Sequence, residues 1–466
     1  MKHRTIAPAL TAAYLLAGAA GASLLAGSAQ RAADDRVPDQ GRTISGPPGD
    51  ILPQRQRPAA VNRILEDRLN RVLPALMREA GLDMWVVINR EYAEDPVYLT
   101  LVPEPVFAAR RTTILVFHDR GPGQGVERLT VSRYPLGTFY SAVWKGGSDE
   151  DQWRELTDLI AQRQPRRIGI NTSREWAFGD GLTAGLHARL MDAVPPALRD
   201  RVVSADALCV RWLETRTALE VDVYPHLVAL ARGVVAEAFS DRVITPGVTT
   251  TDDVAWYIRQ RFADLDLPIW FMPYVNVQRN GMRYPPDTPF FGASGIVERG
   301  DVLHTDVGIH YLRLATDTQE MGYVLRVGED EVPEGLTQAL RVGNRWQDLL
   351  TAEFVTGRTG NEILARVKTA AAREGIDHRT YSHPIGFHGH GAGLMVGMWD
   401  MQEGVPVTGG WRLSPDTTYA IEGDVRVRVP EWDGQVVQIK LEQSALFDGR
   451  SVRYLAGRQT SWHVVR

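Results

Sequence analysis

Four acidic residues in the second half of the chain, Asp306, Asp317, Glu422 and Glu442, stand inside apolar stretches with the composition of β-strands. A charge in a buried strand is costly unless a partner compensates it. With the imidazole of His390, the four carboxylates form an oxygen-rich ligand set that suits divalent ions. The sequence therefore predicts a site for two metal ions, with Mn²⁺ the best match and Zn²⁺ or Co²⁺ as alternatives.

The acids form two pairs, and each pair is predicted to lie across neighbouring strands. Asp306 and Asp317 flank a short turn, and Glu422 and Glu442 lie in two later strand-like stretches. Facing side chains of adjacent strands come within reach of one another. One pair alone would also fit two solvent-facing acids on an exposed sheet. A second pair in similar surroundings favours metal binding.

A glycine-rich segment at 382–394 lies between the two pairs and contains His383, His388 and His390. Glycine lets the backbone come close to a ligand, and imidazole is a common metal ligand and proton carrier. A single histidine is more often a satisfied core residue. Three of them in one such loop indicate metal or substrate contact.

The composition is that of an ordinary soluble globular protein. The chain has 466 residues, a formal net charge of −5, 44 % hydrophobic and 23 % charged residues, which predicts two or three domains. Acids outnumber bases and no long basic run occurs, so no nucleic-acid partner is expected. Cys209 is the only cysteine, which excludes an internal disulfide, and its apolar neighbours predict an inert buried thiol.

The N-terminus has the pattern of an export signal. A basic start at 2–4 precedes an apolar stretch at 6–26 and small residues suited to cleavage, which predicts a signal peptide over 1–29 and a periplasmic or secreted protein. An uncleaved membrane anchor is the alternative, because the stretch approaches the length of a membrane span. After signal removal no stable membrane insertion is expected. Residues 30–58, rich in Pro, Gly, Arg and Asp, are predicted to be a flexible leader.

The remaining chain is predicted to divide near residue 214. Residues 59–214 alternate helical and strand patterns, which indicates an α/β domain. Residues 215–466 contain paired strands and long amphipathic helices and are predicted to form the second domain.

The segments 300–308 and 390–394 resemble the first metal-binding strand and the histidine loop of the creatinase/aminopeptidase P/prolidase superfamily, M24-type metallopeptidases with the "pita-bread" fold. All five ligand positions of that family are filled in order, by Asp306, Asp317, His390, Glu422 and Glu442. The resemblance implies a creatinase-like α/β domain, then an α+β catalytic domain with a curved, mostly antiparallel sheet covered by helices. Creatinase lacks this ligand set, so the resemblance points to the metallopeptidase branch of the superfamily, with an Xaa-Pro aminopeptidase-like enzyme as the expectation.

By this resemblance, Asp317 and Glu442 bridge both ions, Asp306 completes one ion, and His390 and Glu422 complete the other. The implied reaction is hydrolysis of short peptides, plausibly at Xaa-Pro bonds, by attack of a metal-bridging hydroxide. Glu422 would accept the proton and deliver it to the leaving amine. The resemblance also implies a homodimer.

The sequence departs from the family in its other histidines. Family peptidases usually carry a further histidine several residues beyond the metal-binding one, but 395–400 has none, and Pro289 lies where another is often found. His388 or His383 is therefore the candidate to stabilise the tetrahedral intermediate. Lys440 fits equally a cation that steadies the bridging Glu442 and an ordinary alternating strand residue.

Two other functions fit the same residues. A metallohydrolase of non-peptide amides or esters would share the ligand set, because a fold does not fix its substrate. A catalytically weak, metal-dependent peptide-binding protein would explain the missing histidines. The sequence leaves open the substrate, the physiological metal, the oligomeric state and the cleavage of the signal segment.

Overall fold

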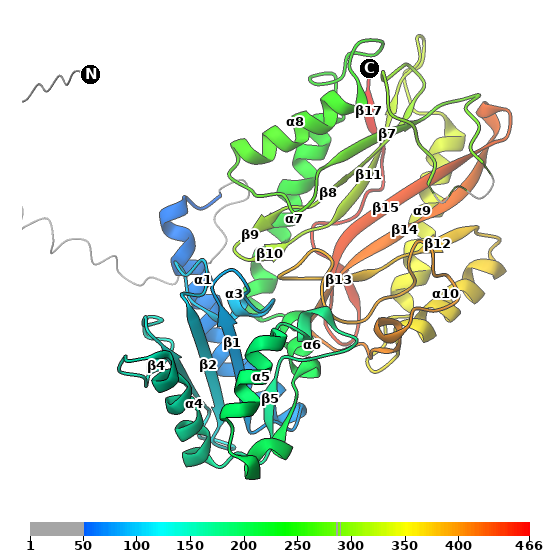
Figure 1. The fold of residues 1–466 in the computed structure, drawn as a ribbon. Coiled ribbons are helices and arrows are strands. Elements are labelled where there is room, and N and C mark those ends of the chain that lie inside the picture. Colours follow the sequence, from blue (N-terminus) through cyan, green and yellow to red (C-terminus); the bar gives the residue numbers. More distant parts are fainter. Residues whose placement is uncertain (1–50, 286–287, 289) are drawn as a thin grey trace, which may run out of the picture. The chain divides into compact units, whose positions relative to one another are not determined.

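The computed structural model describes residues 51–466 except 286, 287 and 289 (Figure 1). The predicted signal peptide and most of the predicted leader lie outside these residues. Helical structure begins at Gln54, inside the predicted leader. In the described part of the chain, no helix combines the length and apolar character needed to cross a membrane. The described residues belong to one unit that contains two large β-sheets.

The first sheet has six strands in the order β4-β3-β2-β1-β5-β6. β1 pairs antiparallel with β2 and parallel with β5, so the sheet is mixed. The central strand β1 is buried along almost its whole length, as expected for a strand with both faces covered. The strands are β1 (Met84–Arg90), β2 (Thr112–Asp119), β3 (Val126–Ser132), β4 (Ser141–Ala142), β5 (Ile168–Ile170) and β6 (Val202–Ser204).

Helices surround this sheet and alternate with its strands. The first helical stretch is continuous from α1 through the π-helical turn η2 into α2, and it ends before Gly81, whose φ of 65° suits a helix end. Cys209 is buried in α6, as predicted, and burial raises the pKa of its thiol. The helices are α1 (Arg57–Asp67), η2 (Arg68–Val72), α2 (Leu73–Glu79), α3 (Tyr98–Leu101), α4 (Asp149–Arg163), α5 (Ala184–Ala193) and α6 (Asp206–Glu214).

The second sheet carries its main strands in the antiparallel order β12-β14-β15-β11-β8-β7. β13 also pairs with β14, β16 with β15, and β17 runs parallel to β11. The strands are β7 (Tyr274–Gln278), β8 (Val302–Val307), β11 (Thr318–Val324), β12 (His378–Thr380), β13 (His383–Ile385), β14 (Thr417–Val429), β15 (Gln435–Phe447), β16 (Val452–Tyr454) and β17 (His463–Val465).

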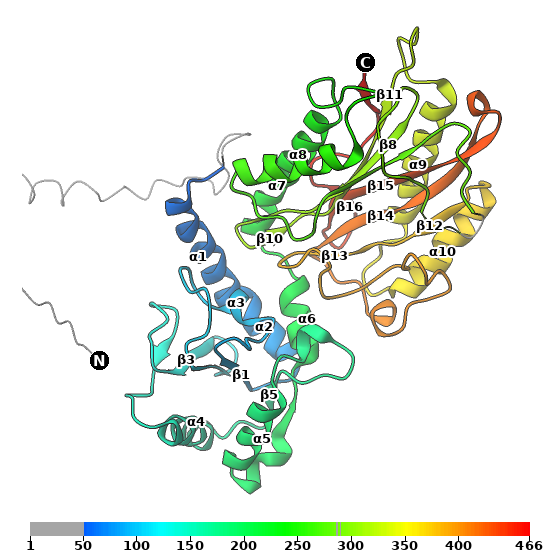
Figure 2. The same cartoon turned by 45° about the horizontal axis from the view of Figure 1, so that its top comes forward.

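Four long helices accompany this sheet: α7 (Ala218–Ala238), α8 (Thr251–Asp264), α9 (Glu334–Ala352) and α10 (Gly360–Arg373) (Figure 2). Capping boxes begin α7, α8 and α10, each formed by a threonine and an acid three residues later. Apolar residues of α7 and α8 pack with β7 and β8 in one core, and those of α9 and α10 pack with β14 and β15 in another.

The helices lie on one face of the sheet and leave the other face to polar residues. Directly paired strand residues share a face, so Gln319, Glu442 and Glu422 point to the same side. Their neighbours Glu320 and Leu441 point the opposite way, Glu320 to Arg232 of α7 and Leu441 to α9 at Gly343. The acids therefore face away from the helices.

Two contacts connect the N-terminal residues to the second sheet region. The hairpin of β9 (His310–Tyr311) and β10 (Leu314–Ala315) lies between Asp306 and Asp317 in the chain. At its tip, Arg313 donates to the Glu104 carboxylate at 2.8 Å and to the Val102 carbonyl at 2.7 Å.

The second contact is a buried ion cluster. Arg68 of η2 donates to Glu220 of α7 at 2.8 Å, and Arg216 donates to the same carboxylate at 2.9 Å. All three side chains are at most 3 % exposed. One carboxylate thus holds two guanidinium groups inside the protein.

Candidate metal centre

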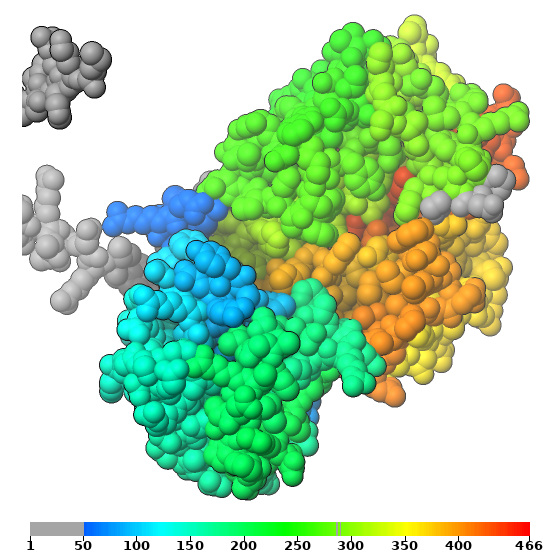
Figure 3. Space-filling model, viewed as in Figure 1, coloured from blue at the N-terminus to red at the C-terminus, as the bar shows by residue number. Residues whose placement is uncertain are grey.

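One side chain from each of five neighbouring strands forms a row across the polar face of the second sheet. In cross-strand order these are Tyr274 on β7, Asp306 on β8, Gln319 on β11, Glu442 on β15 and Glu422 on β14. Each of these residues pairs directly with the next one across the sheet. Strand pairing alone therefore aligns three of the predicted acids, Asp306, Glu442 and Glu422. In the space-filling view the surface is hollowed between green and orange segments, with red atoms at its base (Figure 3).

Asp317 and His383 complete the group from elements beside this row. Asp317 stands immediately before β11, and His383 begins β13, which pairs with β14 beside Glu422. Ligand atoms of these residues form three overlapping sets in which all atoms lie within 4.8 Å of one another: Asp317, His383 and His390; His383, Glu422 and Glu442; and Asp306, Asp317 and Glu442. The structure thus brings the four predicted acids together with two histidines.

His383 lies at the centre of the carboxylates. Its Nε2 is 3.5 Å from Asp317, 3.4 Å from Glu422 and 3.5 Å from Glu442. Its Nδ1 lies 3.1 Å from the Pro384 carbonyl oxygen, which can only accept, so Nδ1 carries a proton and Nε2 faces the acids. Burial opposes a charge on this ring, but Glu422 and Glu442 outweigh it and raise the pKa of His383 to about 10.

The other two histidines of the loop are placed differently. The ring of His390 lies 4.7 Å from that of His383 and 5.1 Å from Trp270, at the edge of the group near Asp317. Loss of solvation and then the charge of His383 lower the pKa of His390 to about 4. His388 stacks on Phe178 at 4.6 Å and belongs to none of the three ligand sets found among the described residues.

The carboxylates repel one another at this spacing. Burial and then the charge of Glu442 raise the pKa values of Asp306 and Asp317 well above the ordinary range, and the same causes raise the pKa of Glu422 to about 8. Clustered acids with raised pKa values are typical of functional sites.

Four polar atoms in this cluster are buried without a hydrogen-bond partner in the described part of the chain: Asp306 Oδ1, Asp317 Oδ1, Glu442 Oε1 and His383 Nε2. Buried polar atoms are rarely left unpaired. Divalent cations would displace the protons from these groups and satisfy the three carboxylate oxygens and the imidazole nitrogen at once, so the residues present fit the metal ions implied by the sequence.

Gln319 and His304 also belong to the site, although the sequence did not single them out. Gln319 Nε2 donates to Glu422 Oε1 at 2.8 Å and to Glu442 Oε2 at 2.9 Å. His304 Nε2 lies 2.8 Å from Gln319 Oε1. Both residues stand two positions from a predicted ligand on the same strand face, and this alternation was the signal that could have found them.

Lys440 shares the face of Glu442 but bonds elsewhere. Its Nζ donates to the Phe291 carbonyl at 2.8 Å, and its strand partner is Asp424. Burial lowers the pKa of Lys440 to about 8, although Asp424 and Asp306 counteract this effect. The amide of Gln319, rather than the ammonium of Lys440, bonds the Glu442 carboxylate.

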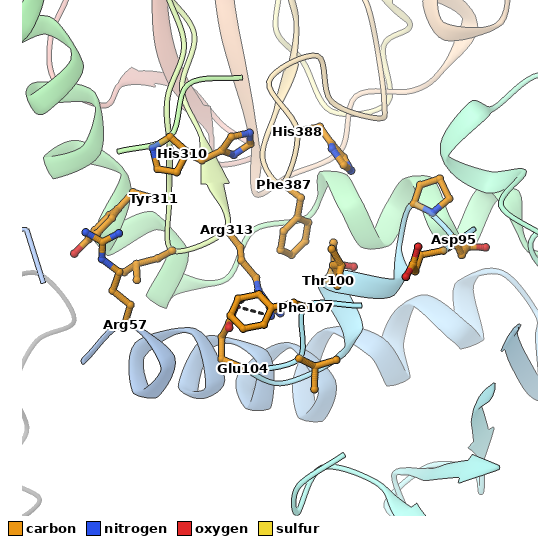
Figure 4. A pocket seen from close by; sticks show the side chains of 16 residues that line it. Arg57, Asp95, Thr100, Glu104, Phe107, His310, Tyr311, Arg313, Phe387 and His388 are labelled. Atoms are coloured by element: carbon orange, nitrogen blue, oxygen red, sulfur yellow. Dashed lines mark hydrogen bonds and ion pairs between the residues drawn. The ribbon is translucent and has the colours of Figure 1, made fainter. Parts of the chain in front are cut away.

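A cavity of about 630 Å³ lies behind the histidine loop (Figure 4). Phe387 and His388 of the loop, His310 and Tyr311 of the β9–β10 hairpin, and Phe107 of the N-terminal region contribute to its lining. None of the four acids of the metal cluster lines it. His388 therefore faces this cavity instead of the carboxylates.

Residues 226–447 match the model of metallopeptidase family M24. The chain is 26 % identical to a methionine aminopeptidase of Thermococcus kodakarensis over 228 residues, which cover 48 % of this chain and 69 % of that protein.

Solved structures share the fold across both sheets. An X-Pro aminopeptidase from Thermotoga maritima superposes with a TM-score of 0.60 at 15 % identity and covers 84 % of this chain and 100 % of its own. An Xaa-Pro dipeptidase from Bacillus anthracis gives 0.55 at 14 % identity, covering 87 % and 100 %. A dipeptidase from Mycobacterium ulcerans gives 0.55 at 18 % identity, covering 87 % and 98 %. The expected fold, an α/β domain followed by a helix-covered antiparallel sheet, is confirmed.

Proposed function

We propose that residues 226–447, which match the model of metallopeptidase family M24, form a catalytic domain that hydrolyses short peptides with two divalent metal ions, preferably Mn²⁺. Xaa-Pro bonds are the proposed target, since solved structures with this fold include Xaa-Pro peptidases. The observation that carries the proposal is the group of four buried ligand atoms without a hydrogen-bond partner in the described part of the chain, on residues that belong to three overlapping ligand sets.

We assign the ions to Asp306, Asp317, Glu422, Glu442 and one imidazole. His383 is the better imidazole ligand, because its Nε2 lies within 3.5 Å of three of the carboxylates, whereas His390 lies at the edge. His390 then becomes the further histidine that family peptidases carry beyond the metal-binding one, and the departure inferred from 395–400 disappears. His390 as the ligand is the alternative.

Divalent ions in such a site lower the pKa of water and polarise the substrate carbonyl. Glu422 accepts a proton at Oε2, since Oε1 already accepts from Gln319, and passes the proton to the leaving amine. His390, at the edge of the group beside Asp317, donates a hydrogen bond to the carbonyl oxygen as negative charge develops there. The apolar residues behind the row keep the acids in fixed positions.

The proposal is tested by metal analysis and turnover of Xaa-Pro dipeptides. We expect about two Mn²⁺ ions per chain, and a loss of kcat of about 10²-fold or more in Glu422→Gln. Glu403→Gln, at an exposed acid paired with Lys368, is the control and should keep wild-type activity. A folded chain that stays empty in excess Mn²⁺, or a Glu422→Gln variant with full turnover, would contradict the proposal.

Substrate class is tested in the same assay. Turnover of simple amides or esters without turnover of any peptide would favour the non-peptide hydrolase. Peptide binding that depends on Mn²⁺ without turnover would favour the binding protein.

We also propose export and dimerisation. The segment 1–29 supports a cleaved signal peptide and a periplasmic or secreted enzyme. N-terminal sequencing of the protein from its native compartment tests the cleavage, and an intact Met1 would contradict it. Light scattering of the purified chain tests the homodimer.

A further inference from the structure

We propose that Gln319 and His304 are positioning residues of the metal centre. The amide of Gln319 holds Glu422 and Glu442 in the orientation that receives the ions, and His304 holds that amide. The inference rests on the proposed metal binding and adds a determinant of its strength.

Gln319 uses all the hydrogen-bonding capacity of its Nε2. One contact goes to Glu422 Oε1 at 2.8 Å and the other to Glu442 Oε2 at 2.9 Å. Each glutamate is therefore bound on one oxygen and keeps the other oxygen for the centre, where Glu442 Oε1 is one of the buried unpaired atoms. Hydrogen bonds to carboxylates are strong and directional, so this contact fixes the rotation of both groups.

The two carboxylates also fix which way the amide points. A flipped amide would set its carbonyl oxygen against two carboxylate oxygens, which is repulsive. Oε1 must then face His304 Nε2, 2.8 Å away, and because a carbonyl oxygen cannot donate, His304 carries its proton on Nε2. A chain of donors thus runs from His304 through Gln319 to both glutamates.

Charge explains why an amide suits position 319. Four carboxylates already balance two divalent ions. A lysine or arginine here would compete with the ions for the same oxygens, and a further acid would add uncompensated charge. Glutamine gives two donors without a net charge. Gln319 and His304 are 6 % and 0 % exposed, so water does not replace these contacts.

The experiment measures Mn²⁺ affinity of the full chain by calorimetry or electron paramagnetic resonance, with circular dichroism of the metal-free protein as the check of folding. Gln319→Leu should weaken Mn²⁺ binding by about 10- to 100-fold, the usual effect of removing a partner that orients a metal ligand. Gln319→Met, which keeps an unbranched side chain of similar length, provides the same test if the leucine variant does not fold.

Gln152→Leu is the matched control. Gln152 is also a buried glutamine, and its Nε2 donates to the Thr112 carbonyl at 3.0 Å and to the Val131 carbonyl at 2.6 Å, both in the first sheet. Mn²⁺ affinity of this variant should stay within about twofold of wild type, because it loses two comparable hydrogen bonds without touching a metal ligand.

A double-mutant cycle tests the role of His304. His304→Leu should weaken Mn²⁺ binding in the wild-type background and add little in the Gln319→Leu background, because His304 acts through that amide. Fully additive effects would overturn the His304 step. Wild-type affinity in folded Gln319→Leu, or equal weakening in Gln152→Leu, would overturn the whole inference. A wild-type chain that binds no Mn²⁺ would instead overturn the proposed function.

Discussion

When no cation is bound, the clustered carboxyl groups of the metal centre destabilise one another's charged forms. Glu422 has a pKa of about 8 in place of 4.5, because burial and Glu442 disfavour its charge. Between these two pKa values, the folded protein retains a proton on Glu422 that the unfolded chain has lost. Its contribution to stability is complete below about pH 4.5 and disappears as the pH rises through 8.

This predicts the pH dependence of the metal-free protein. In EDTA, the contribution of Glu422 should lower Tm between pH 5 and pH 8, and the raised pKa values of Asp306 and Asp317 act in the same direction. His383, with a pKa of about 10, adds stability that is complete below 6.5 and is lost as the pH rises through 10. Excess Mn²⁺ should remove most of the decline.

Thermal unfolding at pH 5, 6.5 and 8, with EDTA or Mn²⁺, provides the measurement. Glu422→Gln should show a smaller decline in EDTA, because the glutamine has no proton to lose. A variant with the same slope as wild type would show that the acid cluster does not control the pH dependence.

The positions of the loop histidines and of Gln319 could not be predicted from the sequence. The four acids were found because charges in apolar strands are unusual, and the structure brings them together. Which histidine lies among them could not be found, because a glycine-rich loop has no periodicity and spacing does not give distance. Gln319 was overlooked because it is neutral, although it stands two residues after Asp317 and pairs directly with Glu442.

At the scale of elements, the paired strands β14 and β15 set the geometry of the centre. They remain in register from Thr417 with Phe447 to Val429 with Gln435, and Glu422 faces Glu442 within this run. Apolar side chains on alternate positions press the strands onto α9. The position of each glutamate is therefore a consequence of packing on the other side of the sheet.

Gly423 is predicted to be essential to this packing. A Cβ at this position would lie 2.3 Å from the Arg379 carbonyl oxygen and 2.4 Å from the Trp346 ring. Gly423→Ala should therefore lower the free energy of unfolding by about 1–3 kcal/mol, the usual cost of overpacking. It should also weaken Mn²⁺ binding, because the adjacent Glu422 must move with the backbone.

Denaturant unfolding and Mn²⁺ titration check this prediction. Gly233→Ala in α7 is the control, since nothing lies within 4 Å of the added Cβ, and it should raise stability by about 0.5–1 kcal/mol. Unchanged stability and metal affinity in Gly423→Ala would show that β12 and α9 can adjust freely.

Long elements could be predicted from the sequence and short ones could not. The paired strands and long amphipathic helices expected in 215–466 are present as β8, β14, β15, α9 and α10, because these elements have long apolar periodicities. β12 and β13 have three residues each and are defined by pairing with β14, which no local pattern reveals.

The buried ion cluster of Arg68, Arg216 and Glu220 joins the N-terminal helical turn η2 to α7. Removing one partner from a buried ion pair leaves an uncompensated charge, which is more costly than the pair is favourable. Glu220→Gln would leave two buried guanidinium groups without an anion, and it should lower the free energy of unfolding by about 3–5 kcal/mol.

Denaturant unfolding measures this loss, with Glu237→Gln as the control. Glu237 pairs with Arg261 at 3.0 Å where both side chains are partly exposed, and its loss should cost about 1 kcal/mol or less. Equal effects of the two substitutions would mean that water reaches the Arg68 cluster. The division near residue 214 remains a prediction, and separate unfolding transitions on its two sides would support it.

The row of side chains across five strands limits how this enzyme can vary in length. Successive strand residues point to opposite faces, so inserting or deleting one residue within β14 or β15 would turn a glutamate toward the helices and an apolar side chain toward the ions. Single-residue gaps between relatives should therefore gather in the turn at Pro430–Trp432 and in the β9–β10 hairpin, where they leave the pairing intact.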